Sequence, residues 1–280
     1  MSGANQSASA LLHVRGLSKS YIRRRALSRS EFVVRAFEDV DISVPRGKTL
    51  ALVGESGAGK STLARCIALL EKPTCGKIWF DGKNVTDLRK KELFPLRRRI
   101  QLVFQDPTSA LNPCFTATEI IAEPLVIHRV GTAAGQQEKA LHLMEQVGLP
   151  ATWAEKRPLE FSGGQRQRLA IARALALDPC LLILDEALSN LDARNQDLIL
   201  QLLANLQGAR SLTYLHVCHE LSLVERFADE VAVMRDGRIV ECQPTPELFA
   251  RPQHLYTRDL LTAMPSVESI YEDRFAREFV

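Results

Sequence analysis

The segment GESGAGKST, residues 54–62, constrains the fold of this chain more than any other feature. It matches the pattern G-x-x-x-x-G-K-[ST] and joins a short apolar stretch, residues 48–56, to a helix-like stretch, residues 61–70. Glycines let the backbone fold around phosphate groups, and the free N–H groups at a helix N-terminus attract anions. The segment therefore predicts a strand, a phosphate-binding loop and a helix in succession, which is typical of an α/β domain.

The side chains of this loop suit a nucleotide with its magnesium ion. Lys60 would place a positive charge on the β- and γ-phosphates, and the hydroxyl of Ser61 can bind Mg²⁺. We expect the other loop residues to contact the phosphates, namely Gly54, Glu55, Ser56, Gly57, Ala58, Gly59 and Thr62. The alternative, a plain glycine turn, does not explain a lysine and a serine at these two positions.

A second motif, LLILDE, places two carboxylates at the end of an apolar strand. Open α/β sheets bind their ligands at the C-terminal ends of the strands. We expect Asp185 to hold Mg²⁺, directly or through water, and Glu186 to act as general base on the attacking water. The competing interpretation is an acidic strand end that faces solvent, which the nearby phosphate loop makes the weaker one.

A third motif, FSGGQ followed by a basic run, predicts a helix that begins at a capping box of Ser162 and Gln165. Gly163 and Gly164 would expose backbone N–H groups there, so this loop can bind an anion without a lysine. A nucleotide held by Lys60 has no obvious way to reach this loop within one subunit. We therefore expect a head-to-tail pair of chains in which each chain's second loop closes over ATP bound to the other.

The remaining pattern alternates strands with helices, which indicates a mostly parallel sheet covered on both faces. A basic stretch with Arg23, Arg24 and Arg25 is expected to form a loop, and residues 107–160 are expected to be mainly helical. The other expected strands are residues 11–21, 99–106, 180–186 and 213–220, with a hairpin over residues 230–241 that turns at Asp236 and Gly237.

Composition excludes several classes of protein. The net charge of +3 is too small to favour nucleic acid as the main partner, and no apolar run is long enough to span a membrane. The N-terminus lacks the pattern of a signal peptide, so we expect the protein in the cytoplasm. The six cysteines form no C-x-x-C pair, which argues against a zinc or iron–sulfur site.

GESGAGKST resembles the Walker A loop, LLILDE the Walker B strand, and FSGGQ with its basic run the signature motif of the ATP-binding cassette (ABC) ATPases. The resemblance covers nearly the whole chain, roughly residues 11–265. It implies an ATPase with a P-loop NTPase fold: a mostly parallel sheet, an N-terminal antiparallel β region and an inserted α-helical subdomain. It also implies that ATP and Mg²⁺ are bound.

Four further residues take their expected roles from this resemblance. Gln105 is similar to the Q-loop glutamine, which contacts Mg²⁺ and senses the membrane subunit, and Asp192 belongs to a D-loop-like SNLD segment at the dimer interface. His219 resembles the switch histidine that contacts the γ-phosphate. Tyr21 is similar to the aromatic residue that stacks on adenine.

The segments VFQDPTSALNP and HLYTRDLL resemble ATPases of the dipeptide, oligopeptide and nickel importers. DEALSNLD and LVERFAD favour the nickel branch, although they do not decide the substrate. We expect residues 1–10 to be disordered, residues 11–250 to form the ATPase domain with its helical subdomain at about 107–178, and residues 251–280 to form an importer-type tail.

The resemblance implies two transmembrane permease subunits, an external substrate-binding protein and a second ATPase, identical or related. The ATPase would then sit on the cytoplasmic face of the inner membrane as a peripheral subunit. The alternatives are a soluble ABC ATPase that acts on nucleic acid and the ATPase of an exporter. A single cassette of 280 residues with an importer-like tail fits neither as well.

Overall fold

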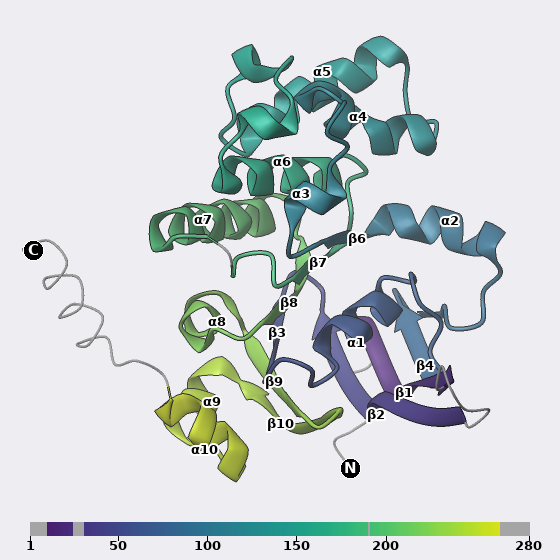
Figure 1. Cartoon of the computed structure of the whole chain (residues 1–280), viewed down its shortest axis with the longest axis vertical. Coiled ribbons are helices and arrows are strands. Elements are labelled where there is room, and N and C mark those ends of the chain that lie inside the picture. The colour runs from purple at the N-terminus through teal and green to yellow at the C-terminus, as the bar shows by residue number, and fades with distance from the viewer. Residues whose placement is uncertain (1–9, 25–30, 190, 264–280) are drawn as a thin grey trace, which may run out of the picture.

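The computed structural model describes residues 10–24, 31–189 and 191–263. Two sheets and a group of helices make up this part of the chain, as Figure 1 shows. The expected disorder of residues 1–10 falls almost entirely outside the described residues, and so do Arg25 and the tail from residue 264 onward.

The larger sheet has six strands in the order β10-β9-β3-β8-β7-β6. Neighbours from β9 to β6 run parallel, and β10 pairs antiparallel with β9. Its strands are β3 (Thr49–Val53), β6 (Ile100–Val103), β7 (Leu181–Asp185), β8 (Thr213–Cys218), β9 (Glu230–Arg235) and β10 (Arg238–Pro244). Every residue of β3, β7 and β8 is buried, as expected for strands covered on both faces.

The smaller sheet is antiparallel and has the order β2-β1-β4-β5. Its strands are β1 (Ala10–Arg24), β2 (Glu31–Pro45), β4 (Cys75–Phe80) and β5 (Lys83–Asn84). The loop expected around Arg23 and Arg24 is wrong for these two residues, because both continue β1 opposite Phe32 and Glu31 of β2. Pairing with β2 provides hydrogen-bond partners for the backbone of both arginines, and a charge pattern alone does not indicate this pairing.

The helices fall into groups. Between β6 and β7 lie α3 (Pro107–Ala110), α4 (Ala117–Ile127), α5 (Ala133–Gln146), two short 3₁₀ turns (Ala151–Trp153 and Pro158–Glu160) and α6 (Gly163–Leu175). The others are α1 (Lys60–Ile67), α2 (Lys90–Arg99), α7 (Ala193–Arg210), α8 (Leu221–Phe227), α9 (Thr245–Ala250) and α10 (Leu255–Thr262). In Figure 1, α4 and α5 lie at one end of the molecule and α9 and α10 at the other.

Two large apolar clusters form most of the core. One packs the helices between β6 and β7 against one face of the larger sheet through residues such as Leu143, Leu169 and Leu184. The other joins the opposite face to α1 and the smaller sheet through residues such as Leu12, Leu63 and Leu215. The parallel sheet is thus covered on both faces, as the alternation of strands and helices predicted.

Candidate active site

The loop between β3 and α1 is held close to its neighbours by two glycines. The φ angle of Gly54 is +148°, and a Cβ atom there would lie 2.0 Å from the backbone oxygen of Met234 in β9. At Gly59, where φ is +102°, a Cβ atom would lie 2.2 Å from the backbone oxygen of Ala36 in β2. Both approaches exclude any side chain, so β9 and β2 together fix the course of the loop.

Lys60 is the first residue of α1, and its side chain turns back over the loop. Its Nζ atom donates hydrogen bonds to the backbone oxygens of Gly54 at 2.7 Å and Glu55 at 2.8 Å. Burial lowers the pKa of this ammonium group, and the nearby carboxylates of Glu186 and Asp185 act in the opposite direction. The loop therefore encloses one positive charge beside exposed backbone groups, which is a suitable environment for phosphate.

Ser61 and Asp185 meet at the edge of the larger sheet. The Oγ atom of Ser61 donates a hydrogen bond of 2.8 Å to Oδ1 of Asp185, the last residue of β7. Asp185 is only 5% exposed, and this burial raises the pKa of its carboxyl group. A hydroxyl and a carboxylate at this distance are the oxygen ligands that Mg²⁺ prefers.

Metal binding by side chains alone is not supported elsewhere. Among residues 10–24, 31–189 and 191–263, no group of three or more histidine, cysteine, aspartate or glutamate side chains could hold a metal ion. Ser61 and Asp185 supply only two oxygen ligands, so they could hold Mg²⁺ only together with phosphate oxygens or water, as is usual at nucleotide sites.

Glu186 and His219 face each other across the ends of two adjacent parallel strands, β7 and β8. The φ angle of Glu186 is +49°, a conformation that is uncommon for residues other than glycine, and its N–H donates to the oxygen of Val217 at 2.9 Å. The Nδ1 atom of His219 lies 3.8 Å from Oε2 of Glu186. An acidic and a basic side chain thus stand together beside Asp185, an arrangement that can transfer a proton.

The motif around Ser162 forms the capping box that the sequence predicts. The N–H of Ser162 donates to Oε1 of Gln165 at 2.9 Å, and the N–H of Gln165 donates to the Ser162 hydroxyl at 3.4 Å. Helix α6 then begins at Gly163. Within the described part of the chain, no hydrogen bond joins this loop to residues 54–62.

At Gly164, the start of α6 packs closely against the start of α7. A Cβ atom at Gly164 would lie 2.7 Å from the side chain of Asn195. Asp192 caps α7 by accepting hydrogen bonds from Asn195, at 2.8 Å from its N–H and 2.7 Å from its side-chain amide. Asp192 therefore lies near the Ser162 loop in space, because Asn195 contacts both Asp192 and Gly164. Asn190, two positions before Asp192, lies outside the described residues.

Neither Gln105 nor Tyr21 forms a hydrogen bond with Ser61, Asp185 or Glu186 among the described residues. Gln105 follows β6, is exposed, and forms no hydrogen bond among the residues that the structure describes. Tyr21 is in β1, where its hydroxyl donates to Oε2 of Glu71 at 2.5 Å and the Nζ atom of Lys19 lies 4.9 Å from its ring centroid. Burial contributes most to raising the pKa of Tyr21, and the hydrogen bond to Glu71 raises this pKa further.

One contact at this site has no signal in the sequence. The N–H of Glu55, inside the first loop, donates to the hydroxyl of Tyr256 in α10 at 3.0 Å, although the two residues are 201 positions apart. Neither residue type nor spacing indicates such a contact.

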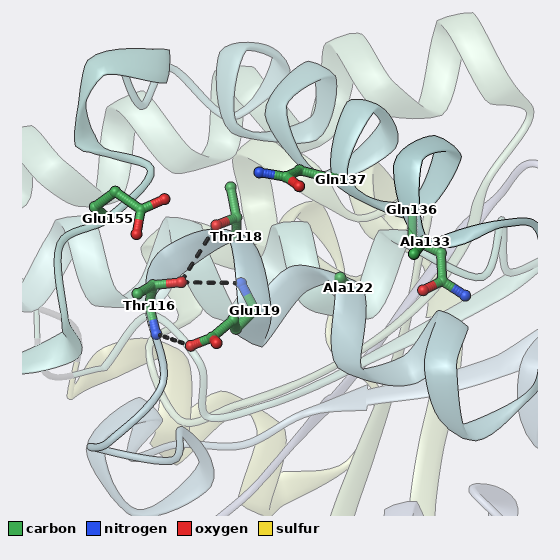
Figure 2. A pocket seen from close by; sticks show the side chains of 8 residues that line it. All are labelled: Thr116, Thr118, Glu119, Ala122, Ala133, Gln136, Gln137 and Glu155. Atoms are coloured by element: carbon green, nitrogen blue, oxygen red, sulfur yellow. Dashed lines mark hydrogen bonds between the residues drawn. The ribbon is translucent and has the colours of Figure 1, made fainter.

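A separate pocket of about 260 Å³ lies among the helices between β6 and β7 (Figure 2). Thr116, Glu119 and Glu155 contribute polar groups to its wall. Thr116 and Glu119 already form hydrogen bonds with each other in the capping box of α4, where the Thr116 N–H donates to Glu119 Oε2 at 2.8 Å. This pocket contains none of the residues that the motifs single out.

Comparison with known proteins identifies the family. A family model described as "ABC transporter" matches residues 37–189, which include the Lys60 loop, the Ser162 loop and β7. The chain belongs to the ABC transporter family. As expected for this family, the chain is an ATPase and binds ATP.

Three similar proteins from bacteria extend over most of the chain. The probable peptide ABC transporter ATP-binding protein y4tS of Sinorhizobium fredii is 48% identical over 91% of this chain and 73% of its own length. The dipeptide transport ATP-binding protein DppF of Haemophilus influenzae is 44% identical over 91% and 78%. The oligopeptide transport ATP-binding protein OppF of Bacillus subtilis is 41% identical over 96% and 87%.

Solved ABC structures share the fold. A dimeric post-hydrolysis state of the ATP-binding cassette MJ0796 bound to ADP and Pi has a TM-score of 0.75 and 30% identity over 84% of this chain and 98% of that one. CbiO1 of Clostridium perfringens, part of the transporter complex CbiONQ, has a TM-score of 0.75 and 27% identity over 94% and 99%. The fold class expected from the motifs is confirmed: a mostly parallel core, an antiparallel N-terminal sheet and inserted helices. No helix among the described residues is long and apolar enough to cross a membrane.

Proposed function

We propose that this ABC ATPase drives the import of peptides through partner permease subunits. The names of y4tS, DppF and OppF support peptides, and all three resemble the chain over nine tenths or more of its length. Peptides are therefore better supported than nickel, which DEALSNLD and LVERFAD favour. A further relative, the putative peptide import ATP-binding protein BOV_A0347 of Brucella ovis, is 44% identical over 91% of this chain and 79% of its own length, and its name supports an importer over an exporter or a protein that acts on nucleic acid.

The meeting of Ser61 and Asp185 carries the proposal for the catalytic centre. Their hydrogen bond brings the phosphate loop and the β7 carboxylate together at the edge of the sheet. Ser61 and Asp185 would hold Mg²⁺, with Gln105 as a third ligand that must approach from the loop after β6. When bound, Mg²⁺ neutralises charge that develops on the phosphate oxygens.

Three side chains would perform the chemistry around the γ-phosphate. Lys60 binds the phosphate oxygens and compensates their negative charge. Glu186 accepts a proton from the attacking water, because it stands beyond Asp185 at the end of β7. His219, 3.8 Å from Glu186, contacts the γ-phosphate and orients the base.

Nucleotide would also join two ATPase chains head to tail. The Ser162 loop presents free N–H groups at the start of a 13-residue helix, and no hydrogen bond ties it to the phosphate loop of its own chain within the described residues. Ser162, Gly163, Gly164 and Gln165 would therefore bind the γ-phosphate of ATP held by the partner chain. Asp192, beside them, would lie at the same interface.

The wider assembly follows from this role. Two permease subunits would dock on this chain and its partner at the cytoplasmic face of the inner membrane, and an external binding protein would deliver the peptide. The partner ATPase is either a second copy or a related chain. Closure of the pair around ATP would reach the permease as a rigid-body movement, and hydrolysis would reverse it.

Uptake by intact cells tests the proposal. We would compare labelled di- and oligopeptides with radioactive nickel in a strain that lacks the gene and in the same strain carrying the gene on a plasmid. We expect the deletion to abolish peptide uptake and leave nickel uptake unchanged. Loss of nickel uptake alone would contradict the peptide assignment, and loss of neither would contradict both substrates.

A further inference from the structure

A tyrosine from the C-terminal end of the described chain reaches the phosphate loop. Tyr256 is the second residue of α10, and its hydroxyl accepts a hydrogen bond of 3.0 Å from the N–H of Glu55. The side chain is only 5% exposed and belongs to the same apolar cluster as Val53, the last residue of β3. The loop is thus attached to an element that follows the whole ATPase sheet in the chain.

The peptide group on each side of Glu55 is held by a different element. The Glu55 N–H is bound by Tyr256, and the Glu55 carbonyl accepts from Nζ of Lys60 at 2.8 Å. The residue that contacts Tyr256 is therefore also one of the two that position the lysine ammonium group. A shift in the position of Tyr256 would therefore move Glu55 in the first turn of the loop and, through it, the ammonium group of Lys60.

The ring of Tyr256 is fixed independently of its hydroxyl. The guanidinium carbon of Arg235 lies 4.8 Å from the ring centroid, and Arg235 directly follows Met234, whose carbonyl abuts Gly54. Because the end of β9 touches both the loop and the ring, Tyr256 has little freedom to move away from Glu55.

The start of α10 is anchored by a buried carboxylate. Glu241 of β10 is 8% exposed and accepts hydrogen bonds from the N–H groups of Gln253 at 2.8 Å and His254 at 3.0 Å. The Nδ1 atom of His254 then accepts from the N–H of Tyr256 at 3.1 Å. These contacts place the tyrosine hydroxyl with the precision that a positioning group needs.

We propose that Tyr256 is a positioning residue of the ATP site, and that docking of α10 and binding of nucleotide therefore favour each other. The inference rests on the proposed role of residues 54–62 as the phosphate loop. By linkage, a contact that organises the loop for nucleotide is itself stabilised when nucleotide binds. Removing the hydroxyl leaves the Glu55 N–H without its partner and frees the loop to sample other conformations.

Nucleotide affinity of the full-length chain provides the test. Tyr256→Phe keeps the ring and its contact with Arg235 and removes only the acceptor. We expect the Kd for ADP with Mg²⁺, measured calorimetrically, to rise about two- to tenfold, which corresponds to the loss of one hydrogen bond. The KM for ATP should rise in parallel, while kcat at saturation changes by less than about twofold, because the hydroxyl does not contact the transferred phosphate.

Tyr214→Phe is the matched control. The Tyr214 hydroxyl donates to the backbone oxygen of Leu203 at 2.9 Å inside the core, so the control also removes one buried hydroxyl, but away from the loop. It should lower Tm and leave the Kd for ADP unchanged. Unchanged affinity in Tyr256→Phe, or an equal loss in both variants, would overturn the inference.

Hydrogen exchange measures the reciprocal effect. In the wild-type chain, ADP should slow amide exchange in residues 255–262, and this protection should be lost in Tyr256→Phe. Equal protection in both chains would overturn the coupling even if affinity changed. A wild-type chain that binds no ADP would instead overturn the proposed phosphate loop, and with it this role for Tyr256.

Discussion

The hydroxyl of Ser61 donates a 2.8 Å hydrogen bond to the carboxylate of Asp185, which is 124 positions away in the sequence. The contact exists because β3 and β7 both pair with β8 in a parallel sheet, so their C-terminal ends reach the same edge. Ser61 follows the loop after β3, and Asp185 is the last residue of β7. Two motifs that are separate in the sequence are thereby joined into one possible binding site for magnesium and phosphate.

Asp185→Asn should separate magnesium binding from nucleotide binding. The amide oxygen can still accept from Ser61, but the charge that burial already disfavours is removed. We expect ATP to bind with similar affinity in EDTA, the increase in affinity caused by Mg²⁺ to disappear, and turnover to fall about a hundredfold or more. Asp197→Asn, which alters an exposed carboxylate paired with Arg226, is the control and should retain turnover. Normal stimulation by Mg²⁺ in Asp185→Asn would exclude Asp185 as its ligand.

Ser162→Arg should affect the pair of chains and not the single chain. Ser162 forms no hydrogen bond with residues 54–62 in the described structure, so the isolated monomer should keep its affinity for ATP within about twofold. Turnover of the assembled transporter should be lost, because a bulky cation would block the start of α6, which we propose binds the partner's nucleotide. A monomer of this variant that no longer binds ATP would contradict a site shared between chains.

Two neighbouring glycines in the same motif should differ in their tolerance of a methyl group. A Cβ at Gly164 would meet the side chain of Asn195 at 2.7 Å, whereas a Cβ at Gly163 would have no neighbour within 4 Å in the described part of the chain. Gly164→Ala should lower the free energy of unfolding by about 1–3 kcal/mol, as overpacking does, and Gly163→Ala should change it by less than about 0.5 kcal/mol. Urea denaturation of both variants checks this, and equal stabilities would refute the steric difference.

A buried histidine should make the fold sensitive to acid. His216 of β8 is fully buried, neither of its ring nitrogens has a hydrogen-bond partner among the described residues, and burial lowers its pKa to about 4. An unfolded chain would protonate this histidine near pH 6.5. Because the unfolded state then binds the extra proton between about pH 6.5 and pH 4, stability should fall as the pH falls through this range.

His216→Leu should remove this acid sensitivity. From the two pKa values, the histidine lowers the free energy of unfolding by about 2 kcal/mol at pH 5 relative to pH 7.5. The leucine variant should therefore gain about that amount on the wild-type chain between pH 7.5 and pH 5 in paired denaturation curves. Parallel pH profiles for the two chains would contradict the assignment.

Local patterns in the sequence predicted the fold well where they coincide with buried strands. The stretches around residues 48–56, 180–186 and 213–220 became β3, β7 and β8, with β3 and β7 shorter than expected at both ends and β8 only at its C-terminal end. The turn at Asp236 and Gly237 joins β9 and β10, and both residues have positive φ angles, as the Asp-Gly pair predicted. The exception is the end of β1, where pairing with the next strand, β2, outweighed the charged residues Arg23 and Arg24.

Side-chain contacts across the fold were less accessible to sequence reasoning. The motifs place Ser61 and Asp185 near the same edge, but the fit of Gly164 against Asn195 depends on how α6 and α7 pack. The contact of Tyr256 with Glu55 depends on where α10 docks after β10. Neither is encoded in a local pattern, because packing between distant elements determines both.

Hydrolysis by Glu186→Gln tests the central claim most directly. The substitution keeps the size of the side chain and removes the base that would take a proton from water. We predict that the full-length variant binds ATP as the wild-type chain does and that its turnover, alone and with its permease, falls at least about a hundredfold. Glu225→Gln, an exposed glutamate of α8, should behave as wild type. Unchanged turnover in Glu186→Gln would contradict the assignment of the catalytic centre.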